Sequence, residues 1–313
     1  MGMIDDDVPV TDIVMPGSHD SGTYGMLFLG ETQSLSFGDQ MRSGARYFDV
    51  RIRRTGEGEL RFYHGILTSE NGYGDFLSDT VRFLEENPTE FLILDYQHRD
   101  PAGDREFDNT LFSMLLDALG EERILCAPEG MSDLDYVDSL TLGEARGKVL
   151  VTFGADARST DCDFVMVRDS DGGTRAGSVL HSPYDERNDV QSEEYVNRVF
   201  GEYIAQYSAY DGGICVLQTQ LLAGNDNGFV PQSMEEIHDP NVTAWIKSCK
   251  DDPDLLGDLN IIMRDYLTPR KCIDIIELHK YKNFVAEEHA SAFDALVAAD
   301  DDIADAIVTD GDL

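Results

Sequence analysis

A histidine and an aspartate stand side by side in the stretch VMPGSHDSGTYG (14–25), directly after a short apolar run. His19 can accept or donate a proton near neutral pH, and Asp20 can orient an imidazole or pair with a cation. The surrounding Gly and Ser residues predict a sharply turning loop. A loop histidine in this setting is commonly only solvated, so any chemistry depends on partners elsewhere in the chain.

Several apolar runs carry or end in polar residues that could be those partners. Asp49 and Arg51 lie two residues apart in one run, and side chains at that spacing point to the same face of a strand. A charge buried there costs several kcal/mol unless it is paired. One further run ends in His64, and another ends in Gln97 and His98. A last run has Asp265 near its end.

The apolar runs alternate with helical patterns along nearly the whole chain. Strands are predicted at 12–17, 45–54, 60–65, 91–98, 148–154, 213–221 and 259–267. Helices are predicted at 74–88, 105–122, 193–210 and 272–285. This alternation, without a linker-like break, predicts an α/β protein with one domain over 1–313, a single distorted TIM-type barrel. The polar region 155–192 is expected to be a loop insertion, and the C-terminal tail is acidic.

In a parallel barrel the C-terminal ends of the strands meet at one mouth, where active sites lie. The polar residues described above would therefore converge there. Two histidines, an arginine and two or more carboxylates supply a general base, a general acid, a phosphate clamp and orienting groups.

Four stretches of the sequence also carry a family resemblance. MPGSHDSGT, GARYFDVRIR, FYHG and RDYL resemble the X domain of phosphatidylinositol-specific phospholipase C, in the order and spacing of the small bacterial, metal-independent type. The first three span residues 14 to 65. The fold that this resemblance implies is a distorted TIM barrel.

The resemblance also implies a reaction. His19 would take the proton from the inositol 2-hydroxyl, whose oxygen attacks phosphorus and forms inositol 1,2-cyclic phosphate. His64 would protonate the departing diacylglycerol oxygen, and Arg51 would hold the phosphate. Asp20 is expected to orient His64, and Asp265 to orient His19. The residues expected to bind substrate are Asp49, Gln97, His98 and Arg158.

No metal or other cofactor is expected. Calcium-dependent members of the family have acidic residues where Arg51 and Gln97 stand here. A guanidinium and a neutral amide cannot replace the oxygen anions that a hard cation needs.

Other interpretations remain open at the level of sequence. His64 could be a surface histidine, Asp265 a helix N-cap, and Asp49 with Arg51 a structural ion pair. The enzyme could act on another lipid or on a soluble glycerophosphodiester. A catalytically silent X domain that serves as a binding module is a further alternative, although intact His19, Arg51 and His64 favour an enzyme.

The composition excludes some partners. The 61 acidic and 24 basic residues give a net charge of −37, which repels nucleic acid and, at low salt, anionic membranes. Adaptation to a high-salt habitat explains this charge as well as an acidic protein from an ordinary habitat does.

The five cysteines form no CxxC pair and are expected to be free thiols. No signal peptide or membrane span is visible, so a soluble protein of unknown location is expected; secretion is the alternative that the family suggests. As the resemblance implies, the expected partner is phospholipid, which a monomer meets transiently at a membrane surface.

Overall fold

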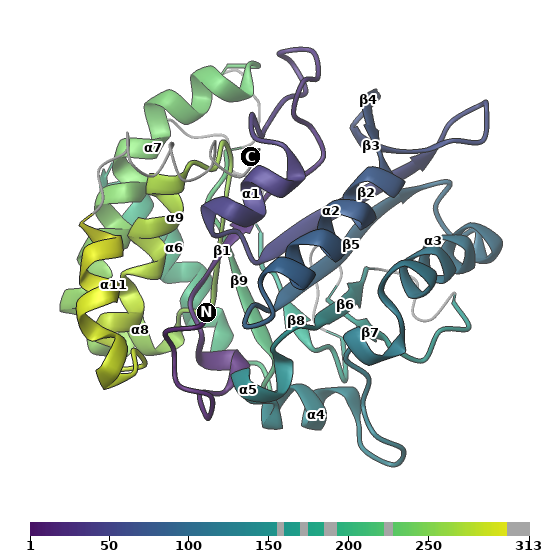
Figure 1. Cartoon of the computed structure of the whole chain (residues 1–313). Helices are drawn as coiled ribbons and strands as arrows, with labels where there is room; N and C mark the ends of the chain where they lie inside the picture. Colours follow the sequence, from purple (N-terminus) through teal and green to yellow (C-terminus); the bar gives the residue numbers. More distant parts are fainter. Residues whose placement is uncertain (155–159, 170–174, 185–192, 222–227, 299–313) are drawn as a thin grey trace.

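The computed structural model describes the whole chain except residues 155–159, 170–174, 185–192, 222–227 and 299–313 (Figure 1). Its strands are β1 (Met15–Ser18), β2 (Tyr47–Arg54), β3 (Leu60–His64), β4 (Leu67–Gly72), β5 (Leu92–Asp100), β6 (Val149–Phe153), β7 (Val165–Val167), β8 (Leu180–His181), β9 (Ile214–Gln218) and β10 (Ile261–Arg264). Its α-helices are α1 (Phe37–Ser43), α2 (Tyr73–Glu86), α3 (Arg105–Leu119), α4 (Asp133–Ser139), α5 (Leu142–Ala145), α6 (Glu193–Tyr207), α7 (Pro231–Ser248), α8 (Pro253–Asp258), α9 (Pro269–Ile276), α10 (Leu278–Tyr281) and α11 (Ala290–Val297).

Eight of these strands form a parallel barrel in the order β7-β6-β5-β2-β1-β10-β9-β8. The ring is nearly closed between β7 and β8 by one bridge, Arg168 with Leu180. Two backbone hydrogen bonds support this bridge, from Val179 N to Val167 O at 2.8 Å and from Asp169 N to Leu180 O at 2.9 Å. The predicted α/β barrel is therefore confirmed.

An antiparallel hairpin of β3 and β4 extends the far end of β2 beyond the ring. It stands beside the mouth in Figure 1, above the ends of the barrel strands. The β2–β5 pairing shifts register after Val50, so that Arg51 lies opposite His98. Such a bulge changes the direction of the side chains that follow it.

Alternate residues of the strands serve two different cores. One set, including Tyr47, Ile93 and Leu150, packs inside the barrel. The other set, including Phe48, Leu94 and Val151, packs outwards with residues of α1, α2 and α3. A third cluster packs β9 and β10 against α6, α7 and α9. The helices accordingly lie on both flanks of the barrel (Figure 1).

The sequence predicts a loop insertion at 155–192, but the structure differs there. The described part of this segment contains β7 and β8, which complete the barrel. These strands are three and two residues long, too short to give a visible period-2 pattern in a polar stretch. The hairpin strand β4 was also missed, and the helix expected at 272–285 is divided into α9 and α10. The acidic tail lies outside the described residues from 299 onwards.

Gly22 allows the first loop to lie against the β3 strand. A Cβ atom at Gly22 would lie 2.0 Å from Phe62, which is buried in a cluster with Phe37 and Phe76. We expect Gly22→Ala to lower the free energy of unfolding by about 1–3 kcal/mol, since Phe62 cannot move out of this cluster without loss of packing. Urea unfolding measures this change.

Gly56→Ala is the matched control, because a Cβ there meets nothing within 4 Å. Its free energy of unfolding should stay within about 0.5 kcal/mol of the wild type. Equal stability of the two variants would contradict the close packing inferred at Gly22.

Candidate functional site

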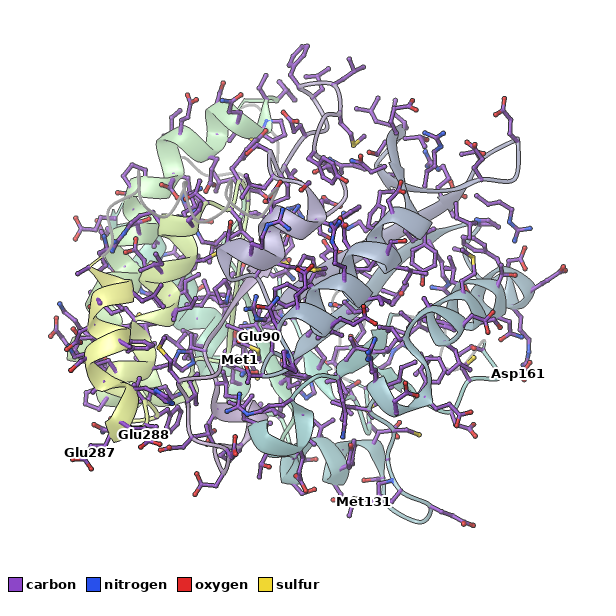
Figure 2. All side chains as sticks on the ribbon, in the orientation of Figure 1. Met1, Glu90, Met131, Asp161, Glu287 and Glu288 are labelled. Carbon is purple, nitrogen blue, oxygen red and sulfur yellow. The ribbon has the colours of Figure 1, made fainter. Side chains whose placement is uncertain are left out.

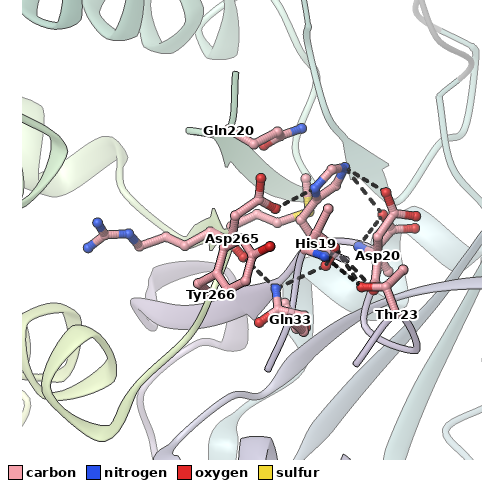
Figure 3. A network of polar contacts seen from close by, with 12 residues as sticks. His19, Asp20, Thr23, Gln33, Gln220, Asp265 and Tyr266 are labelled. Carbon is pink, nitrogen blue, oxygen red and sulfur yellow. Dashed lines mark hydrogen bonds and ion pairs between the residues drawn. The ribbon is translucent and has the colours of Figure 1, made fainter. Parts of the chain in front are cut away.

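Polar side chains from four strand ends meet at the mouth of the barrel. His19 follows β1, Asp49 and Arg51 lie on β2, His64 ends β3, and Asp265 follows β10. Asp20 adopts φ 44°, a left-handed conformation that a residue other than glycine rarely adopts. This turn carries the Asp20 carboxylate to the Nε2 side of the His19 ring, and the ring lies between Asp265 and Asp20 in Figure 3.

The His19 ring is hydrogen-bonded on one side to Asp265. The distance from Nδ1 to Asp265 Oδ1 is 2.6 Å, and Asp20 Oδ2 lies 3.3 Å from Nε2 on the other side. Burial lowers the pKa of His19, but the Asp265 and Asp20 carboxylates outweigh it and raise this pKa to about 9. Arg51 opposes them only in part. Asp265 thus fixes the ring with Nε2 towards the mouth and makes it a stronger base.

Arg51 lies at the centre of the site. Its Nε is 2.8 Å from Asp20 Oδ1, and its Nη2 is 2.8 Å from Asp49 Oδ2 and 3.2 Å from His19 Nε2. Burial raises the pKa of Asp49, but Arg51 and His19 outweigh this effect and lower it below its ordinary value. The sequence-based alternative of an Asp49–Arg51 ion pair therefore describes a real contact, at a site where the guanidinium also reaches the imidazole.

His64 is the more exposed of the two histidines in the site. Its Nδ1 lies 3.0 Å from the carbonyl oxygen of Gly30, and its Nε2 lies 3.6 Å from Asp20 Oδ2. A proton on Nδ1 can be donated to that carbonyl, which leaves Nε2 directed towards Asp20. The same carboxylate oxygen therefore lies near both imidazoles, and it is closer to His19 than to His64.

Asp265 is not a helix N-cap. The N-cap of α9 is Thr268, whose side chain accepts a hydrogen bond from Lys271 N. The Asp265 side chain is buried and directed to His19 instead. The structure thus brings together His19, Asp20, Asp49, Arg51, His64 and Asp265, the set that the sequence places at the mouth; their catalytic roles stay predictions.

The other expected substrate-binding residues lie differently. Gln97 is buried, and its Nε2 donates to Tyr47 Oη at 3.0 Å inside the barrel. His98 is half-buried at the register shift opposite Arg51. Arg158 lies outside the described residues.

A second buried charge pair lies inside the barrel and was missed from the sequence. Arg168 follows β7, and its Nε lies 3.2 Å from Asp95 Oδ2. Asp95 also accepts from Tyr47 Oη at 2.6 Å and from Thr152 Oγ1 at 2.8 Å. Burial raises the pKa of Asp95 despite the neighbouring guanidinium. Arg168 was not found because it lies in the segment that resembles a loop; only the spacing of two from the inward-facing Met166 could have indicated it.

The acidic residues of the site are close enough to hold a metal ion, yet Arg51 lies among them. Ligand atoms of His19, Asp20 and Asp49 lie within 4.8 Å of one another. The Arg51 guanidinium contacts both carboxylates at 2.8 Å. A divalent cation at about 4 Å from this guanidinium would be repelled by roughly 8 kcal/mol at an effective dielectric constant of 20, about 4 kcal/mol for each unit of its charge. The residues present therefore do not fit calcium.

Three further histidines are buried, and one of them, His181, also contacts a carboxylate, since its Nδ1 lies 2.6 Å from Asp169 Oδ2. His181, His238 and His279 are each hydrogen-bonded to backbone groups. Burial lowers the pKa of His238 to about 4 and that of His279 to about 3, so both rings are neutral.

None of the described helices is long and apolar enough to cross a membrane.

Comparisons with known proteins agree with the geometry. Residues 7–153 match the family model for phosphatidylinositol-specific phospholipase C, X domain. The 1-phosphatidylinositol phosphodiesterase of Staphylococcus aureus (strain Newman) is 32% identical over 99 residues, which are 30% of this chain and 32% of that protein. The PI-PLC X domain-containing protein 2 of Mus musculus is 28% identical over 156 residues, 40% of this chain and 45% of that protein. The match thus spans about a third of the bacterial relative and less than half of the murine one.

Solved structures show the same fold over most of the chain. The phosphatidylinositol-specific phospholipase C of Listeria monocytogenes has a TM-score of 0.65 at 16% identity and covers 89% of this chain and 97% of its own. A structure of the Staphylococcus aureus enzyme has a TM-score of 0.64 at 19% identity, with coverages of 85% and 89%. Residues 7–153, just under half of the chain, thus match the X-domain family of phosphatidylinositol-specific phospholipase C, and the solved structures share the barrel fold over most of the chain.

Proposed function

We propose that the protein cleaves phosphatidylinositol, or a related inositol phospholipid, by attack of the substrate's own 2-hydroxyl on phosphorus. The observation that carries this proposal is the arrangement of two imidazoles around one partly buried guanidinium. His19 and His64 each direct Nε2 towards Asp20, and Arg51 lies against His19 and Asp20. This is the set of groups that an internal phosphoryl transfer needs.

In this reaction neutral His19 accepts the proton of the 2-hydroxyl at Nε2. The oxygen forms a bond to phosphorus, and the bond from phosphorus to the diacylglycerol oxygen breaks. His64 donates a proton to that oxygen, so the products are diacylglycerol and inositol 1,2-cyclic phosphate. Arg51 stabilises the negative charge on the non-bridging oxygens. Asp265 holds the His19 tautomer through the 2.6 Å contact.

A related phosphodiesterase activity on another lipid or on a soluble glycerophosphodiester uses the same groups, and so the assay must include both kinds of substrate. The non-enzymatic alternative is a catalytically silent binding module. Turnover with product identification separates these functions, because a binding module produces neither cyclic phosphate nor diacylglycerol.

We expect His19→Ala and His64→Ala each to reduce turnover of phosphatidylinositol by about 10²–10⁴-fold, since a general base or acid is removed. A substrate with a very good leaving group should restore activity to His64→Ala but not to His19→Ala, because only the acid becomes dispensable. Release of the cyclic phosphate, followed by phosphorus NMR, measures both effects.

The matched control is His289→Ala, in the 3-10 helix Glu287–His289 far from the mouth (Figure 2 labels Glu287 and Glu288). This variant should keep wild-type activity. Near-wild-type turnover by either site variant on a natural lipid would show that the assigned roles are wrong.

Arg51 is proposed to replace a metal ion. Activity should be unchanged in excess EDTA, and Arg51→Lys should lose about 100-fold or more, since an ammonium lacks the planar fork of donors. Arg53→Lys is the control on the same strand, where the guanidinium pairs with Asp100 at 2.7 Å. Loss of activity with EDTA that micromolar calcium reverses would refute the metal-independent assignment.

We further propose that the substrate is met at a membrane surface through an apolar tip, defined as Leu27, Phe28, Leu29 and Ile66. Their exposed fractions are 68%, 62%, 51% and 93%. The tip lies next to His64, because Gly30 holds the His64 ring and Ile66 follows it by two residues. The stretch 21–30 contains no charged residue in a chain of net charge −37. Apolar insertion rather than charge attraction is therefore the contact that this surface supports.

Replacing Leu27 and Phe28 by Ser should lower activity on phosphatidylinositol vesicles by at least about tenfold. A fully buried Leu or Phe contributes about 1.5–3 kcal/mol each, and 1.4 kcal/mol is a factor of ten. Activity on a monomeric, water-soluble inositol phosphodiester should not change. Met131→Ser is the control, since Met131 is exposed at the opposite end of the barrel (Figure 2). Equal losses on vesicles and on the soluble substrate would contradict the docking role.

A further inference from the structure

A glutamine that the proposed reaction does not use joins the two strand ends that carry His19 and Asp265. Gln33 is fully buried, in the stretch between β1 and α1. Its Nε2 donates to His19 O at 3.0 Å and to Arg264 O at 2.9 Å. Its Oε1 accepts from Leu267 N at 3.0 Å. All three partners are backbone atoms of the two segments that hold the histidine and the aspartate (Figure 3).

The neighbours of Gln33 hold the same turn of backbone. Thr32 O accepts a hydrogen bond from Tyr266 N at 2.7 Å, and Glu31 O accepts one from Tyr266 Oη at 2.5 Å. Gly30 O contacts His64 Nδ1 at 3.0 Å. The four residues 30–33, which we call the strap, therefore contact the Asp265 turn and both histidines of the site.

The turn that carries Asp265 needs such support. Tyr266 adopts φ 45°, a left-handed conformation that is strained for a residue other than glycine. Without its hydrogen bonds to the strap, the turn would relax towards ordinary backbone angles. The Asp265 carboxylate, one residue earlier, would then move relative to the His19 ring.

We propose that Gln33 is a positioning residue, which sets the distance between His19 and Asp265 by bridging the backbone segments that carry them. This inference rests on the proposed function for its catalytic meaning, but the bridge itself can be tested without any turnover. Because the Gln33 amide touches neither imidazole nor carboxylate, it acts on the pair only through the backbone.

The charge of His19 reports on this distance. The groups that face its ring are Asp265 from the turn after β10, Asp20 from its own loop, and Asp49 and Arg51 from β2. Asp265 is the strongest of those that raise the pKa of His19 to about 9 against the effect of burial. If Gln33 is lost and the pair separates, this pKa should fall towards the ordinary value of about 6.5.

The test uses Gln33→Met, which keeps the volume and removes the amide, and Gln33→Asn, which keeps the amide but is too short to bridge the segments. Gln40 supplies the matched controls, Gln40→Met and Gln40→Asn. It is also a fully buried glutamine with three hydrogen bonds, to Ser18 Oγ, Ser21 O and Leu35 O, and none to the Asp265 turn. The two pairs should lose similar stability.

Imidazole titration by NMR is the first readout, with the His19 signal assigned by its loss in His19→Gln. The pKa of His19 should fall by at least about one unit, a tenfold change in proton affinity, in both Gln33 variants and stay unchanged in the Gln40 variants. A His19 pKa that moves equally in the two pairs would overturn the proposal. So would failure of both Gln33 variants to fold when the Gln40 variants fold, since Gln33 would then be structural.

The pH dependence of kcat/KM is the second readout. The reaction needs His19 neutral and His64 protonated, so kcat/KM of the wild type should be bell-shaped in pH, with the limb that His19 sets near pH 9. In Gln33→Met the limb that His19 sets should lie at least about one pH unit lower, and the misplaced base should reduce the maximum of kcat/KM roughly 10- to 100-fold. Wild-type protein without any turnover would refute the proposed function and leave the NMR test of Gln33 intact.

Discussion

Partial burial of the Arg51 guanidinium, whose side chain is only 16% exposed, determines much of what surrounds it. A charge removed from water costs several kcal/mol unless it is paired and hydrogen-bonded, and Arg51 meets that requirement through Asp20 and Asp49 at 2.8 Å. Both carboxylates are fully buried. They in turn need the positive charges of Arg51 and His19, so removal of any one partner leaves the others uncompensated. The cluster is therefore a unit, in which geometry and charge balance depend on each other.

The backbone is shaped to hold this unit. Asp20 and Tyr266 adopt φ of 44° and 45°, each beside a residue of the His19–Asp265 pair. Such conformations persist only where surrounding contacts fix them. Asp20 N is held by Asp49 Oδ2 at 3.0 Å, and Tyr266 N by Thr32 O at 2.7 Å. The two strained residues thus follow the ends of the paired strands β1 and β10, and one lies on each side of the contact between His19 and Asp265.

The sequence allowed the barrel and the main polar residues to be predicted, because both follow from short-range rules. Inward-facing Asp49 and Arg51 follow from the two-residue period of a strand, and His64 from its position at the end of one. The strands β7 and β8 could not be predicted, since three and two residues carry no period. Arg168 was missed with them. The Gly30 carbonyl could not be found either, because a backbone acceptor has no sequence signature.

The charged groups of this cluster have opposing effects on the pKa of His19. Asp265 and Asp20 stabilise the imidazolium and raise the pKa to about 9, which makes the ring a strong base but leaves little of it neutral at pH 7. Arg51, 3.2 Å from Nε2, opposes that charge and is able to donate to the neutral ring. The position of the guanidinium therefore affects two quantities at once. In the proposed reaction it provides positive charge for the phosphate, and in the structure it opposes the carboxylates that raise the pKa of His19.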